Sequence, residues 1–161
     1  MSARRLIVEA DGGSRGNPGT AAGGAIVVDP DSGEVIVELG VYVGVATNNV
    51  AEYNGMLAGI EAALGYGADA LHVRMDSKLV VEQMSGRWKI KHPDMKKLAD
   101  RAREVIGSVP TTFEWIPRAE NAAADRLANE SMDQRQSFRR DLGEPSPGAP
   151  EARDPSADTL F

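Results

Sequence analysis

The hydrophobic pattern of the first third of the chain predicts three antiparallel strands. Apolar residues alternate weakly over residues 6–10, and further apolar runs lie at 25–29 and 34–43. A glycine-rich stretch over residues 12–24 separates the first two runs, and a Pro-Asp-Ser-Gly sequence typical of a hairpin turn separates the last two. We therefore expect a strand that ends in a turn, a glycine-rich connection and a hairpin.

From residue 47 onward, helical and strand patterns alternate. Residues 48–64 predict a helix, because apolar residues from Tyr53 to Leu64 recur at helical spacing and capping residues precede them. The further predicted elements are a strand over 70–76, a helix ended by Gly86, a helix opened by Pro93 and reaching 106, a strand over 111–116, and a last helix that begins near Glu120 or Asn121.

The order of these elements, βββαβααβα, indicates an α/β fold with a mixed five-stranded sheet flanked by helices. We expect one folded domain over residues 1–133. Residues 134–161 contain four of the nine prolines and show no apolar periodicity, so we expect a disordered Pro-rich tail or linker there. Such a linker is typical of the front part of a longer protein, with a further C-terminal domain beyond it.

The composition of the chain excludes cysteine-based sites and membrane spans. The 161 residues include no cysteine, which excludes disulfides, zinc–thiolate sites and thiol nucleophiles. Any metal must therefore use oxygen ligands or the two histidines. No apolar run approaches the ~18 residues of a membrane span, and the N-terminus enters a strand pattern without a signal-peptide segment. We expect a cytoplasmic monomer without a membrane partner.

The basic residues are unevenly distributed along the chain, which weakens the argument from net charge. A net charge of −6 argues against a nucleic-acid partner, because such proteins usually carry an excess of Lys and Arg. Seven basic residues nevertheless lie within residues 87–103. This local cluster leaves a polyanionic partner open, although it also fits an ordinary solvated face.

Four carboxylates fall where predicted strands end or predicted helices begin. Asp11 ends the first strand and Asp76 ends the fourth. Glu52 lies in the first turn of the helix over 48–64, and Asp125 lies early in the last helix. Each alone also fits an ordinary role, as a turn residue, a capping-box partner, a helix cap or a solvated helix acid.

Together, the four carboxylates predict a metal site. If the first and fourth strands are neighbours, their ends bring Asp11 and Asp76 side by side, and two helix starts deliver the other two acids to the same edge. Carboxylates gathered this closely repel one another by several kcal/mol unless cations lie between them. Oxygen-only ligands suit Mg²⁺ or Mn²⁺, and two such ions about 3.5–4 Å apart can stabilise phosphoryl displacement.

Five segments, in order, resemble the successive motifs of ribonuclease H type 1: DGGSRGNPG (11–19), TNNVAEYNG (47–55), MDSKLV (75–80), GRWKIK (86–91) and IPRAENAAADRLAN (116–129). They cover nearly all of the predicted folded part. The resemblance implies hydrolysis of the RNA strand of an RNA–DNA hybrid. It also implies that Asp11, Glu52, Asp76 and Asp125 are the metal ligands and catalytic carboxylates.

The resemblance also indicates a surface for the hybrid. Small residues let the backbone approach a 2′-hydroxyl, and asparagine amides can reach base edges in the minor groove. Each candidate also has an ordinary reading in turns, caps, the core or a solvated face; Trp115, in a strand, is expected in the core. The candidate nucleic-acid contacts are Gly12, Gly13, Ser14, Gly16, Asn17, Thr47, Asn48, Asn49, Lys78, Trp88, Lys89 and Lys91.

The chain departs from the family pattern in three places. Many members carry a histidine before the final Asp, whereas this loop has none. Arg118, Glu120 and Asn121 are candidates to replace it, and we expect Glu120 to act at the edge of the metal site unless it only caps the last helix. Lys78 stands where many members have Gln, and the long basic protrusion of some members is absent. The sequence thus resembles a branch lacking both the histidine and the protrusion.

These observations favour an endoribonuclease that uses two Mg²⁺ or Mn²⁺ ions and leaves 5′-phosphate and 3′-hydroxyl ends. Two alternatives stay open at this point. One is a hybrid-binding module without catalysis, which the complete carboxylate set disfavours. The other is a different metal nuclease on the same fold, because a fold alone does not define a function.

Overall fold

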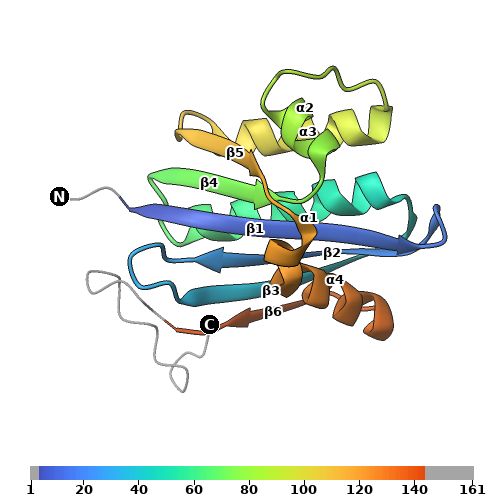
Figure 1. Ribbon diagram of the computed structural model, residues 1–161, viewed down its shortest axis with the longest axis horizontal. Helices are drawn as coiled ribbons and strands as arrows, with labels where there is room; N and C mark the ends of the chain where they lie inside the picture. Colours follow the sequence, from blue (N-terminus) through green and yellow to red (C-terminus); the bar gives the residue numbers. More distant parts are fainter. Residues whose placement is uncertain (1–3, 144–161) are drawn as a thin grey trace.

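A six-stranded sheet forms the centre of the molecule. The computed structural model describes residues 4–143, and within them the strands lie in the order β5-β4-β1-β2-β3-β6 (Figure 1). The strands are β1 (Arg5–Arg15), β2 (Gly19–Val28), β3 (Val35–Ala46), β4 (Ala70–Met75), β5 (Thr111–Trp115) and β6 (Phe138–Asp141). β1 pairs antiparallel with β2 and parallel with β4, so the sheet is mixed as predicted.

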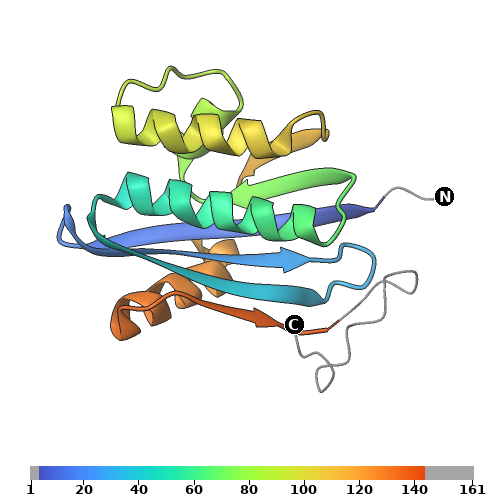
Figure 2. The same cartoon turned by 180° about the vertical axis from the view of Figure 1, so that it is seen from behind.

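Helices cover both faces of this sheet. In the described part of the chain they are α1 (Asn48–Gly65), α2 (Lys78–Met84), α3 (Pro93–Ile106), the 3-10 helix η1 (Arg118–Asn121) and α4 (Ala122–Gln134). Figure 2 shows α1 lying across one face with α3 beside it, whereas Figure 1 shows α4 on the opposite face. None of these described helices is long and apolar enough to cross a membrane.

Local chemistry explains where the helices begin and end. The Thr47 hydroxyl accepts a hydrogen bond from the Val50 N–H at 3.3 Å, which caps α1. Pro93 occupies the first turn of α3, where a missing N–H costs nothing. Gly107, with φ of 56°, ends α3 in the left-handed region that glycine tolerates.

The main core lies between the sheet and the layer of α1 and α3. Val8 of β1 packs there with Tyr53, Met56 and Ile60 of α1, and all four side chains are fully buried. The Tyr53 hydroxyl donates a 2.7 Å hydrogen bond to Oε1 of Gln83, so its polar end is satisfied inside the core. Of the predicted helical stripe, Tyr53 and Ile60 are fully buried, whereas Leu57 and Leu64 are partly buried against the same core.

Two glycines of the sheet let the helices come unusually close. A Cβ at Gly12 would lie 2.3 Å from the Glu52 backbone N, and one at Gly24 would lie 2.4 Å from the Ala124 carbonyl O. No side chain larger than hydrogen fits at either position. The glycines thus seat α1 and α4 directly on the strands, next to Glu52 and Asp125.

The glycine-rich stretch is strand, contrary to the prediction. β1 continues to Arg15 and β2 begins at Gly19, so Asp11 lies inside a long strand and not at its end. The register runs without interruption from Ile7↔Val28 to Arg15↔Thr20. The low strand propensity of glycine did not predict these strands, because close helix packing and antiparallel pairing hold the small residues in an extended conformation.

The sixth strand corrects both the predicted strand count and the predicted boundary at residue 133. β6 pairs antiparallel with β3 from Val37↔Asp141 to Gly40↔Phe138. The Phe138 ring lies over Gly40, where an added Cβ would be 2.3 Å from a ring carbon. The folded part thus includes part of the predicted tail, and the rest of that tail, from residue 144, lies outside the described residues.

Candidate active site

Strand register brings Asp11 and Asp76 together. The parallel pairing of β1 with β4 ends at Ala10↔Met75, and the two aspartates are the next residues on each chain. The predicted neighbourhood of the first and fourth strands is confirmed. Both carboxylates are shielded from solvent: Asp11 is 7% exposed, and the Asp76 side chain is 9% exposed.

Glu52 and Asp125 reach the same edge from two helices on opposite faces. Glu52 lies near the start of α1, directly over Gly12 of β1. Asp125 lies in the first turn of α4 and shares a hydrogen bond with Asp11. Thr47, and not Asn49, caps α1, so the capping-box alternative for Glu52 is wrong.

The electrostatics of these side chains show that they form one group. Burial, together with the neighbouring carboxylates of Asp76 and Asp125, raises the pKa of Asp11 to about 8, and a hydrogen bond from the Gly12 N–H opposes part of that rise. Burial also raises the pKa of Glu52 to about 7, with Asp76 adding to the rise. A hydrogen bond from Ser77 and the charge of Arg118 oppose that rise. Two carboxylic acids at this edge therefore bind protons near neutral pH.

This donor set fits hard divalent cations. It offers carboxylate oxygens in a site where like charges already hold protons, and a cation would relieve the same repulsion. Within residues 4–143, no three His, Cys, Asp or Glu side chains are already gathered as ligands around one point. Side-chain rotation at the edge would accompany metal binding.

Asn121 is a buried, hydrogen-bonded neighbour of this group. Its side chain is 1% exposed, and Nδ2 donates to the Ala10 carbonyl at 2.8 Å and to Oδ1 of Asp76 at 3.2 Å. Both partners are acceptors, which fixes the amide orientation. Its Oδ1 is buried without a hydrogen-bond partner.

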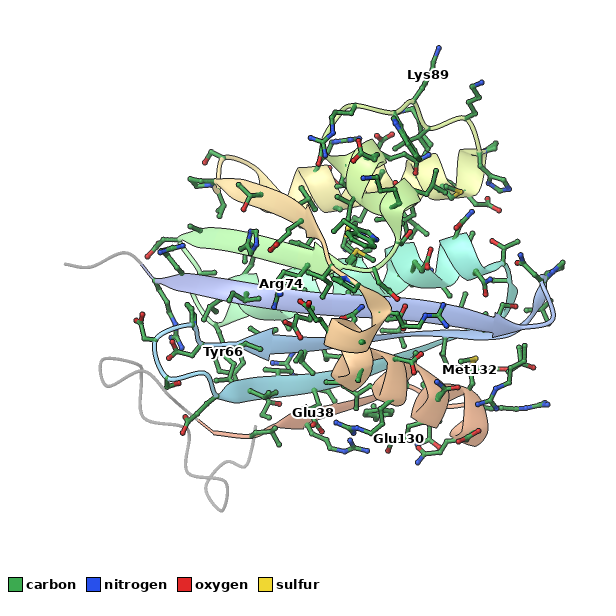
Figure 3. All side chains as sticks on the ribbon, viewed as in Figure 1. Glu38, Tyr66, Arg74, Lys89, Glu130 and Met132 are labelled. Atoms are coloured by element: carbon green, nitrogen blue, oxygen red, sulfur yellow. The ribbon has the colours of Figure 1, made fainter. Side chains whose placement is uncertain are left out.

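Arg118 and Glu120, on η1, take different partners. Nε of Arg118 lies 3.6 Å from Oδ2 of Asp76. Glu120 lies 3.4 Å from Nη2 of Arg74, whose Nη1 donates to Glu9 at 2.6 Å on the sheet surface (Figure 3). The structure therefore brings Arg118 and Asn121 to the carboxylates, whereas it pairs Glu120 with Arg74.

The glycine-rich hairpin and the start of α1 form one surface beside the carboxylates. The Ser14 hydroxyl donates to the Ala46 carbonyl at 2.7 Å. Oδ1 of Asn17 accepts a 3.1 Å hydrogen bond from the Asn48 N–H. Of the predicted contacts, Gly12, Gly13, Ser14, Gly16, Asn17, Thr47, Asn48 and Asn49 therefore lie together on the hairpin and at this helix start.

The basic candidates lie on a separate part of the molecule. Lys89 and Lys91 are exposed in the loop between α2 and α3, where Figure 3 shows Lys89 pointing outward. Trp88, in the same loop, is 47% exposed and so is available to a ligand. Lys78 lies nearer the carboxylates, with Nζ 6.0 Å from the centre of the Trp115 ring.

Trp115 corrects a prediction, because it is 46% exposed and does not belong to the core. Its Nε1–H donates to the Asp76 carbonyl at 3.2 Å, so the ring lies beside a catalytic candidate.

Ser77, which forms a hydrogen bond with Glu52, is a further neighbour of the site that was not predicted from the sequence. Its place directly after Asp76 in the Asp-Ser pair was the available signal.

Comparisons with known proteins agree with this geometry. A family described as Reverse transcriptase-like matches residues 9–131. The Bifunctional protein Rv2228c of Mycobacterium tuberculosis is 54% identical over 130 residues, which are 80% of this chain and 36% of that protein. The chain thus spans about a third of this relative. A solved structure of its N-terminal RNase H domain, fused to maltose binding protein, superposes with a TM-score of 0.79 at 53% identity, over 82% of this chain and 96% of that one.

Two further solved structures extend the likeness. The RNase H1 of the archaeon Halobacterium salinarum is 43% identical with a TM-score of 0.75, over 81% of this chain and 98% of that one. LC11-RNase H1 in complex with an RNA/DNA hybrid is 37% identical with a TM-score of 0.75, over the same shares of the two chains.

A mixed sheet with helices on both faces and four acids at one edge places the chain in the class of ribonuclease H-like folds. Within that class, the chain belongs to the ribonuclease H family.

Proposed function

We propose that this chain is an endoribonuclease that hydrolyses the RNA strand of RNA–DNA hybrids and leaves 5′-phosphate and 3′-hydroxyl ends. The observation that carries the proposal is the mutual repulsion of Asp11, Asp76 and Asp125, which adds to burial in raising the pKa of Asp11 to about 8. Buried acids that repel one another cost stability, and such perturbed groups cluster at functional sites. The hybrid complex of the similar LC11-RNase H1 supports the choice of substrate.

Asp11, Glu52, Asp76 and Asp125 would hold two Mg²⁺ or Mn²⁺ ions. When bound, such ions supply activation of the attacking water and stabilisation of the leaving 3′-oxygen. The remaining chemistry belongs to the chain itself. Asn121 holds the Asp76 carboxylate in place through the hydrogen bond that its Nδ2 donates to Oδ1 of Asp76.

The hairpin surface would bind the hybrid along its backbone. The exposed Gly16 lets the hairpin backbone approach the minor groove closely, where a 2′-hydroxyl distinguishes RNA from DNA. The Thr47 hydroxyl, which accepts from the Val50 N–H, can donate a hydrogen bond to a phosphate of the DNA strand. Trp88, Lys89 and Lys91 extend this contact to more distant phosphates and sugars.

A substrate panel tests the proposal. Body-labelled RNA–DNA hybrid, double-stranded RNA, double-stranded DNA and single-stranded RNA are incubated with the protein in Mg²⁺ and in Mn²⁺. We expect cleavage of the RNA in the hybrid alone, with products that a ligase requiring 5′-phosphate accepts. Binding of the hybrid without cleavage in either metal would favour a non-catalytic module. Cleavage of double-stranded DNA would favour another metal nuclease on this fold.

A further inference from the structure

Arg15 connects the glycine-rich hairpin to the helix that carries Asp125. It is the last residue of β1, and its Nη2 donates to Oδ1 of Asn129 at 3.2 Å and to the Asn129 carbonyl at 3.4 Å. Its Nη1 pairs with Asp133 at 2.7 Å. Residues 125, 129 and 133 are spaced four apart, so they line one side of α4. Arg15 therefore binds to the same side of α4 on which Asp125 lies.

Asn129 in turn forms hydrogen bonds with Asp125. Its Nδ2 donates to the Asp125 carbonyl at 3.0 Å and lies 3.4 Å from the Asp125 carboxylate Oδ1. A guanidinium group only donates hydrogen bonds, so it requires the amide oxygen of Asn129 on its own side. The amide NH₂ must then face Asp125. Arg15 thus sets which end of the Asn129 amide the carboxylate meets.

Asp125 needs such support more than Asp11 and Asp76 do. Asp11 lies within β1 and Asp76 directly follows β4, and both side chains are shielded, whereas Asp125 is exposed on the first turn of a helix. A free aspartate at such a position can rotate into solvent. The donation from Asn129 limits that rotation and keeps the carboxylate near Asp11, with which it shares a hydrogen bond.

The hairpin that carries Arg15 is also tied to the surface proposed to bind the hybrid. Ser14 is bonded to the end of β3, and Asn17 is bonded to the start of α1. The guanidinium is already paired with Asp133, which reduces its value as a phosphate ligand. We propose that Arg15 is a positioning residue that orients the catalytic carboxylate of Asp125 through Asn129 and links the hairpin to the metal site. This inference rests on the proposed function.

The test compares Arg15→Gln, Asn129→Ala and the double variant with the parent. Arg126→Gln is the matched control, because Arg126 is the neighbour of Asp125 on α4 but pairs with Glu38, at 3.8 Å. Two quantities are measured for each protein: Mg²⁺ affinity by calorimetry without substrate, and the Mg²⁺ concentration that half-activates hybrid cleavage. Melting temperatures in EDTA confirm that each variant folds.

We expect each single variant to weaken Mg²⁺ binding and to raise the half-activating concentration by about 3- to 10-fold, below the ~10- to 100-fold typical of buried groups that orient metal ligands. The double variant should be no worse than the singles, because both changes break one chain of contacts. Arg15→Lys should recover part of the loss, and Arg126→Gln should match the parent. Affinity for the hybrid in EDTA should change less than about twofold.

Three results among the variants would overturn the inference. The first is an unchanged Mg²⁺ affinity in Arg15→Gln with weaker, less salt-dependent hybrid binding, which would make Arg15 a phosphate contact. The second is additive loss in the double variant, and the third is an equal loss in Arg126→Gln. A parent that binds Mg²⁺ but cleaves no hybrid overturns the proposed function and leaves the calorimetric comparison to decide this inference. A parent that binds no Mg²⁺ overturns both.

Discussion

Single residues on η1 differ sharply in what they can contribute to the site. Arg118 and Asn121 reach Asp76, whereas Glu120 between them pairs with Arg74. Consecutive residues on a tight helical turn point in different directions, so neighbours in sequence need not share a site. The positive charge of Arg118 also lowers the pKa of Glu52. Arg118 is therefore the stronger candidate for the role that a loop histidine plays in many family members.

Two substitutions separate these candidates. Arg118→Gln should lower hybrid cleavage by about 10-fold or more, because it removes the cation beside Asp76. Glu120→Gln should lower it by less than about threefold, because the paired Glu120 is half-exposed and loses only a surface ion pair. Initial rates in saturating Mg²⁺ measure both. A larger effect at Glu120 than at Arg118 would reinstate the prediction made from the sequence.

The four carboxylates could be predicted from the sequence because each lies within a motif of several residues that also defines its element. Glu120 and Trp115 could not be placed in the same way. The partner of Glu120 is Arg74 on a strand 46 positions away, and the 46% exposure of Trp115 depends on how the end of β5 packs against the rest of the fold. Both facts belong to tertiary structure and leave no local trace.

At the scale of elements, β6 adds an edge strand to the sheet beyond the predicted domain boundary. Arg140 pairs with Glu38 of β3 at 3.1 Å and also with Glu130 of α4, and its guanidinium lies 4.3 Å from the centre of the Phe138 ring. The labels in Figure 3 show Glu38 and Glu130 on the same part of the molecule. The sequence Phe-Arg-Arg-Asp has no apolar periodicity, so its strand depends on these long-range contacts and could not be predicted locally.

Two truncations test the role of β6. Removal of residues 134–161 should lower the melting temperature by about 5–10 °C, because it deletes the β3–β6 pairing, the Phe138 contact and the Arg140 ion pairs. Removal of residues 144–161 should change it by less than about 2 °C. Thermal melts in one buffer compare the two. Equal melting temperatures for both shortened chains would show that β6 adds nothing to stability.

At the scale of the whole molecule, the clustered acids make stability depend on pH. Asp11 has a folded pKa of about 8 against an ordinary 3.8, and Glu52 has about 7 against 4.5. At a pH between the unfolded and the folded pKa of each acid, the folded state binds more protons than the unfolded state. The free energy of unfolding therefore falls as pH rises through that range. Glu82 and Glu114, whose pKa values are lowered, act in the opposite sense only below about pH 4.5.

We therefore expect the melting temperature in EDTA to fall between pH 5 and pH 8. Mg²⁺ should reduce this slope, because a cation stabilises the ionised acids. Asp76→Asn should also reduce it, since Asp76 raises the pKa values of both groups. Melts across this range, with and without Mg²⁺, measure the effect. A melting temperature in EDTA that rises toward pH 8 would contradict the assigned direction of both shifts.

Hybrid cleavage by Asp76→Asn, beside the parent, tests the central claim most directly. Asparagine keeps an oxygen that can accept the hydrogen bond from Asn121, so the fold and hybrid binding should persist. The lost charge should reduce cleavage of the labelled RNA strand in Mg²⁺ by at least about 10³-fold, or roughly 4 kcal/mol of transition-state stabilisation. Hybrid affinity in EDTA should stay within about twofold of the parent. Cleavage at the parental rate by a folded Asp76→Asn protein would show that these carboxylates are not the site of hydrolysis.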